Sequence, residues 1–159
     1  MKTEGLELAA SKCALGLLRS DDLVQVGVQA LEHGCDSPSL RILAGLNASE
    51  AEEARRMFDQ ALSELDLEVP SKRDAVMHLA REIAEAILAG TTEPYFGAKR
   101  IWDLSLRASS EELPELDSFV YAASEWEDRP EDRVIFEEGI IAAARDLVNS
   151  RGSTPSHSP

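Results

Sequence analysis

The sequence predicts an all-α protein, an irregular bundle of seven or eight mostly antiparallel helices without a β-sheet. Apolar residues recur with helical period along most of the chain, and the connections between these segments are short. Five of the seven prolines stand at or just before the start of such a segment, where a helix tolerates proline best. These five are Pro38, Pro70, Pro94, Pro114 and Pro130.

The first half of the chain predicts four helices, over about residues 4–18, 20–34, 38–45 and 51–65. The second helix begins at a cap of Ser20 or Asp21 and ends at Gly34, and these signals outweigh a strand-like alternation over residues 24–28. Ser37 opens the third helix, which ends near Gly45. No phrase recurs at a fixed period of about 30 to 45 residues, so a regular solenoid is not expected.

The second half predicts four more helices, over about residues 71–90, from Thr91 or Thr92 to 104, over 114–126 and over 130–147. Ser71 caps the first of these and Gly90 ends it. The 159 residues suffice for one domain with a real core, so we expect a single domain over 1–149. The tail over 150–159 holds almost no apolar residue and is expected to be disordered.

The N-terminal segment and the two cysteines predict a cytoplasmic protein. Glu4 and Glu7 stand where a signal peptide avoids acids, and no long apolar segment follows them. The apolar stretches are far too short for a membrane span. Cys13 and Cys35 belong to no CxxC pair, so neither a disulfide scaffold nor a redox motif is expected.

Acidic residues are concentrated in one window of the chain. The formal net charge is −14, which argues against binding to nucleic acid, because phosphate binding needs clustered Lys and Arg. Residues 111–138 contain eleven Asp or Glu, and only Arg129 and Arg133 oppose them. The window is either a solvated surface, a face that steers a basic partner, or a metal cluster.

Catalytic motifs are missing from the sequence. There is no glycine-rich phosphate loop, no GxSxG, no HExxH and no paired ExxH. His78, Glu82 and Glu85 share one helix face, which is either an ordinary polar surface or part of a metal site. We therefore expect no enzyme, no cofactor, and no catalytic or metal-binding residue, with a metal-binding protein or enzyme at that face as the alternative.

The two tryptophans occupy different surroundings. Trp102 follows Ile101 in a helical stripe and is expected in the core. Trp126 is surrounded by acids near a helix end, which is typical of an interface that receives Arg or Lys, although a lid over the core fits as well. The candidate partner-binding residues are Glu125, Trp126, Glu127, Asp128, Glu131 and Asp132.

Three phrases of the sequence resemble a group of small, uncharacterised bacterial proteins of the cytosol. They are DSPSLRILAG at 36–45, EPYFGAKRIW at 93–102 and ELDSFVYAASEWED at 115–128. The resemblance covers about residues 20–148 and implies an all-helical domain. It implies no activity, cofactor or catalytic residue.

The sequence thus predicts a non-catalytic, acidic protein-interaction module with a basic protein partner and no binding to nucleic acid or membrane. A concrete form is an immunity or antitoxin-like inhibitor, whose acids pair with the Lys and Arg that the partner uses on nucleic acid. A structural homodimer subunit is a further alternative.

Overall fold

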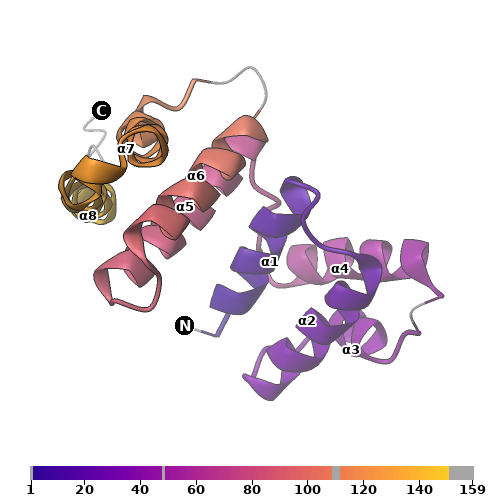
Figure 1. The fold of residues 1–159 in the computed structure, drawn as a ribbon. Helices are drawn as coiled ribbons and strands as arrows, with labels where there is room; N and C mark the ends of the chain where they lie inside the picture. Colours follow the sequence, from indigo (N-terminus) through magenta and orange to yellow (C-terminus); the bar gives the residue numbers. More distant parts are fainter. Residues whose placement is uncertain (1, 48, 109–111, 151–159) are drawn as a thin grey trace, which may run out of the picture. The chain divides into compact units, whose positions relative to one another are not determined.

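A computed structural model describes residues 2–47, 49–108 and 112–150. Within these ranges the chain forms eight α-helices and two short 3-10 turns and has no strand, which confirms the predicted all-α fold (Figure 1). By its internal contacts the chain divides into two compact units, residues 1–75 and 76–159, and each is described by itself. The single domain over 1–149 stays a prediction. Of the expected tail, only Ser150, the last residue of a helix, lies within the described residues.

The first unit consists of α1 (Glu4–Ala14), α2 (Ser20–Glu32), α3 (Pro38–Ala44), α4 (Ala51–Glu64) and the first turn of α5 (Lys72–Leu88). The short helix α3 packs against both α2 and α4. Its side chains Leu40 and Leu43 are fully buried beside Phe58 of α4. At the crossing of α2 and α3, a Cβ on Gly27 would lie 3.1 Å from Leu43 Cγ, so glycine allows the close approach.

The first helix ends four residues earlier than the sequence indicates. Gly16 has a φ of +70°, a left-handed conformation that glycine adopts without strain. The N–H of Leu17 then bonds back to the carbonyl of Lys12, which closes the helix end. Leu17 is consequently 36% exposed, although its helical spacing from Ala10 and Cys13 predicts a buried position.

The N-terminus of α3 is held by a carboxylate from α4. Ser37 caps the helix through the N–H of Leu40, as its position before Pro38 predicts. Buried Ser39 donates two hydrogen bonds to Glu64, from its N–H to Oε1 at 3.0 Å and from its hydroxyl to Oε2 at 2.5 Å. These hydrogen bonds lower the pKa of Glu64, because they favour the ionised carboxylate.

Replacing Glu64 with glutamine should therefore destabilise the fold at pH 7 more than at low pH. A carboxylate whose pKa is lowered by folding contributes stability above its unfolded pKa of about 4.3, and this stability is lost as the pH falls through the folded value. Urea unfolding of wild type and Glu64→Gln at pH 7 and at about pH 3 tests this, with exposed Glu68→Gln as the control. The same stability difference at both pH values would contradict it.

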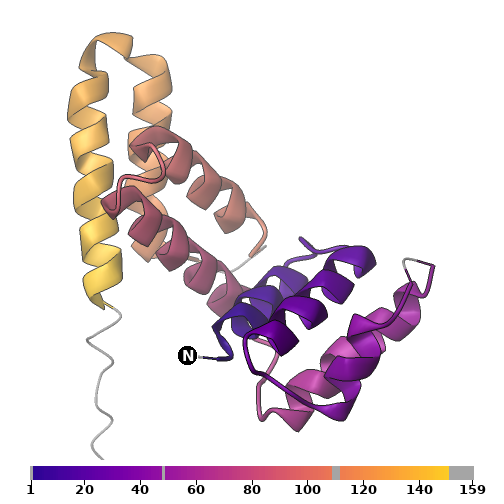
Figure 2. The ribbon, with the colours of Figure 1, turned by 90° about the horizontal axis from the view of Figure 1, so that it is seen from below.

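The second unit consists of the rest of α5, followed by α6 (Pro94–Leu106), α7 (Asp117–Asp128) and α8 (Arg133–Ser150). A 3-10 turn precedes each of the last two helices: η1 (Pro114–Leu116) and η2 (Pro130–Asp132). Helix α7 packs against α6 and α8, and its Phe119 is fully buried. Figure 2 shows α7 and α8 side by side as an antiparallel hairpin.

Helix α6 begins at Pro94 rather than at Thr91 or Thr92. Gly90 has a φ of +80°, and the N–H groups of Thr91 and Thr92 bond back to the carbonyl of Ala86, so both threonines belong to the end of α5. Trp102 is half-buried, and the ammonium of Lys99 lies 4.1 Å from its ring centroid. The expectation that Trp102 lies in the core is therefore wrong in degree, because one face of the ring receives a cation instead of core side chains.

Candidate functional site

We call residues 125–138 the acidic corner: they form the end of α7, the turn η2 and the start of α8. The corner is formed by a turn that begins at a proline. Asp128 ends α7, and Arg129 before Pro130 takes an extended conformation, with φ −128° and ψ 74°. The turn η2 follows at once and returns the chain into α8 at Arg133. All six candidate partner-binding residues lie in this short stretch.

Trp126 lies in an aromatic and cationic stack. The ring of Tyr95 from α6 is nearly parallel to it, at 15°, with 3.9 Å between ring centroids. The guanidinium carbon of Arg133 lies 3.8 Å from the Trp126 centroid. Since two groups so close to one ring cannot share a face, Tyr95 and Arg133 cover opposite faces. The indole N–H donates to Glu137 Oε2 at 3.4 Å, so only part of the ring edge is left for a partner.

Glu127 is joined to α6 by two contacts. Its Oε2 accepts the Tyr95 hydroxyl hydrogen at 2.8 Å and lies 3.4 Å from the Lys99 ammonium. The hydrogen bond from Tyr95, followed by the nearby Lys99 charge, lowers the pKa of Glu127. Burial, followed by the contact with Glu127, raises the pKa of Tyr95. Glu127 therefore stays ionised and holds α6 against α7.

The remaining four acids divide into two kinds. Glu125 and Asp132 both pair with Arg129, at 3.6 Å and 2.6 Å. Asp128 and Glu131 are exposed, and none of the described residues forms an ion pair with them. The structure thus brings all six residues to one corner, and of their five acids only Asp128 and Glu131 have no ion-pair partner among the described residues.

Exposed apolar side chains lie in the same corner. Tyr121 is 62% exposed, Val134 70% and Ile135 63%. Tyr121 meets buried Phe136 edge-on, with ring centroids 6.4 Å apart, so it borders the part of α8 next to Phe136. We call the exposed surface formed by Tyr121, Val134, Ile135, Gly139 and Ala142 the hairpin face.

The helical spacing of Phe136, Ile140, Ala143, Ala144 and Leu147 predicts one buried stripe on α8 and no hairpin face. Ile140 and Leu147 of that stripe are buried, as expected. The run Val134, Ile135 and Phe136, however, places three consecutive apolar residues in the first turn of α8, so Val134 and Ile135 fall outside that stripe. Apolar residues outside the buried stripe were the sequence signal for a second apolar surface.

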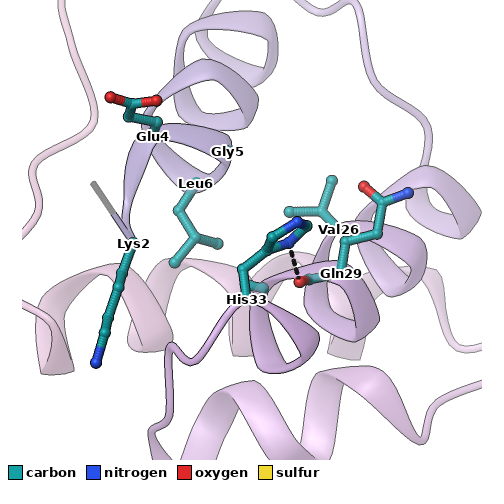
Figure 3. A pocket seen from close by; sticks show the side chains of 8 residues that line it. Lys2, Glu4, Gly5, Leu6, Val26, Gln29 and His33 are labelled. Atoms are coloured by element: carbon teal, nitrogen blue, oxygen red, sulfur yellow. Dashed lines mark hydrogen bonds between the residues drawn. The ribbon is translucent and has the colours of Figure 1, made fainter.

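The first unit contains a separate pocket of about 550 Å³ between the start of α1 and the end of α2 (Figure 3). Leu6 and Val26 provide its apolar wall. His33 Nδ1 lies 2.6 Å from the carbonyl oxygen of Gln29, which can only accept, so Nδ1 carries the hydrogen. Lys2 and Glu4 line the pocket too, but their charged ends point away from the His33 ring and from each other (Figure 3). The pocket therefore does not assemble an acid and a base.

The other residues that the sequence singles out are not gathered into a site. His78 is half-buried, Glu82 and Glu85 are exposed, and no group of three or more His, Cys, Asp or Glu in the described part of the chain is arranged to hold a metal ion. Both cysteines are buried and free. Burial raises the pKa of Cys13, which keeps its thiol protonated. Cys35 donates to the carbonyl of Lys2 at 2.8 Å.

Among the described helices, none has the length and apolar character that crossing a membrane requires. Comparisons of the chain with protein-family models, with curated proteins and with solved structures found no match. The resemblance to small bacterial proteins stays a prediction.

Proposed function

We propose that this chain is a non-catalytic protein-interaction module of the cytoplasm whose acidic α7–α8 corner binds a basic surface of another protein. One observation carries the proposal: Tyr121, Val134 and Ile135, the large exposed apolar side chains of the hairpin face, lie within the window 111–138, which holds −9 of the net charge. An apolar centre with a charged rim is the usual composition of a protein interface. A surface that only solubilised the chain would need the acids but not Tyr121, Val134 and Ile135.

The charge of the corner selects the partner. Asp128, Glu131 and Glu138 are exposed, and no described residue pairs with them. Their field attracts a Lys- or Arg-rich surface and repels nucleic acid and other acidic proteins. An immunity or antitoxin-like inhibitor of a protein that acts on nucleic acid fits this selection, because such a target exposes a basic surface.

Reversal of three exposed acids should weaken association with the partner mainly through the on-rate. The variant Asp128→Lys, Glu131→Lys, Glu138→Lys changes the charge of the corner by six units and leaves the ion pairs of Arg129 in place. We expect an on-rate at least about tenfold lower at low salt and a smaller difference at high salt. Capture from the native host at both salt concentrations, with mass spectrometry, identifies the partner, and surface-based kinetics measure the rate.

A matched variant separates this effect from net charge alone. Glu32→Lys, Glu68→Lys, Glu82→Lys makes the same change in charge at exposed acids outside the corner. We expect it to keep most of the wild-type on-rate, because attraction at physiological salt falls off within about 8 Å. Equal capture of the same proteins by all three chains would overturn the proposal.

A further inference from the structure

Helix α8 exposes one continuous face along its whole length. Its exposed positions 135, 138, 139, 142, 145, 146 and 149 follow the three- and four-residue spacing of a single helix side, and Val134 and Ser150 are exposed at its two ends. Positions 136, 140, 144 and 147 form the opposite, buried side. The first half of the exposed face is apolar except for Glu138, and the second half is polar.

Gly139 lies in the middle of this face. It is exposed, and a Cβ added to it would meet no atom of the described residues within 4 Å. Glycine weakens a helix interior relative to alanine, so the position lowers the stability of α8, and no packing contact in the described part of the chain requires a glycine there. Ile135 precedes Gly139 by four residues and Ala142 follows it by three, so the three residues share this side of α8. Tyr121 of α7 contacts Phe136, the residue after Ile135. Small residues next to a large apolar side chain allow another helix to approach α8 closely at Gly139.

Acids border the hairpin face on both helices. Glu138 lies on α8 beside Ile135 and Ala142. On α7, Asp128 follows Tyr121 by seven residues and so shares its side of the helix, whereas Glu125, four residues after Tyr121, is paired with Arg129. A second copy of this chain related by a two-fold axis would bring these acids against themselves. Cationic side chains on both edges of the incoming helix match them instead.

We propose, as a refinement that rests on the proposed function, that the hairpin face binds an amphipathic α-helix of the partner, with a narrow apolar stripe between two rows of Lys or Arg, crossing α8 at Gly139. The apolar stripe packs on Ile135 and Tyr121, and the closest approach of the two helix axes falls at the glycine. This is the helix-in-groove mode of recognition, with charge fixing the orientation of the ligand.

The test uses the full chain and two labelled synthetic peptides of 18 residues, a length chosen to match α8. One peptide places Leu and Ala at helical spacing between Lys and Arg, and the other contains the same residues scrambled. We expect the first peptide to become helical on binding and to bind at least about tenfold tighter than the scrambled one, as read by circular dichroism and fluorescence anisotropy. Equal binding of the two would overturn the helix inference and leave the basic-partner proposal standing. Binding of neither would also overturn it, while the capture experiment judges the proposed function separately.

Substitution of Gly139 separates binding from stability, because we expect the melting temperature to rise while peptide binding weakens. A purely structural role of Gly139 would not produce these opposite changes. Gly139→Ala should raise Tm by about 2 °C, because it removes a glycine from an open helix site, and should still weaken binding of the helical peptide. Gly139→Leu should weaken binding of the helical peptide at least about tenfold. Gly5→Leu is the matched control, since Gly5 is also an exposed helical glycine with nothing within 4 Å. If wild type is a dimer by light scattering and Gly139→Leu a monomer, a second copy occupies the face and the proposal is wrong.

Discussion

Replacing Trp126 with alanine should lower the free energy of unfolding by about 2–4 kcal/mol. The indole is half-buried and is covered by Tyr95 on one face and Arg133 on the other. Its loss removes an aromatic stack and a cation–π contact, each worth about 0.5–1.5 kcal/mol beyond the apolar area buried. Urea unfolding of the full chain, followed by circular dichroism, measures the effect.

Trp102 provides a control of the same residue type. It is also half-buried, but among the described residues its ring has a cation–π contact with Lys99 and no stacked aromatic ring. Trp102→Ala should therefore cost less than Trp126→Ala. The opposite result would be that Trp126→Ala leaves the free energy of unfolding unchanged and abolishes partner capture. That result would make Trp126 a residue that contacts the partner, and it would show that the stack does not stabilise the fold.

Local chemistry explains why most helix boundaries were predictable from the sequence. Ser37 before Pro38, Ser71 before α5 and Pro130 before the last turn act within three or four residues of themselves. Their effect on the backbone is the same in any fold. The exceptions also have local causes, because the left-handed φ of Gly16 ends α1 early.

The residues of the acidic corner could be predicted from the sequence, but the ion pairs and ring contacts that they form could not. Counting charges in residues 111–138 treats each acid alike, whereas Arg129 pairs with both Glu125 and Asp132 and no described residue pairs with Asp128. Tyr95 and Trp126 are brought together only by the packing of α6 on α7. Contacts between distant residues depend on helix packing, which periodicity within one helix does not encode.

Replacing Gly97 with valine should cost about 3 kcal/mol of unfolding free energy and disturb the acidic corner at a distance. A Cβ at Gly97 would lie 2.5 Å from Ile87 Cδ1 and 2.7 Å from Ile87 Cγ1, so α5 and α6 approach each other closely there. Valine cannot fit unless Ile87 moves or the two helices separate. Urea unfolding measures the cost, and Gly5→Val, at an open helix site, should change stability by less than about 1 kcal/mol.

Gly97→Val should also disturb the acidic corner, because two side chains of α6 contact it. Tyr95 lies two residues before Gly97 on α6 and stacks on Trp126, and Lys99 lies two residues after it and pairs with Glu127. If valine displaces α6 from α5, the stack loosens, and tryptophan fluorescence of the folded variant should shift. The double variant Gly97→Val, Ile87→Ala should recover part of the loss, because the smaller side chain makes room for the new methyl groups. Additive costs in the double variant would mean that Ile87 does not limit the approach, and the link from the α5–α6 contact to the stack would fail.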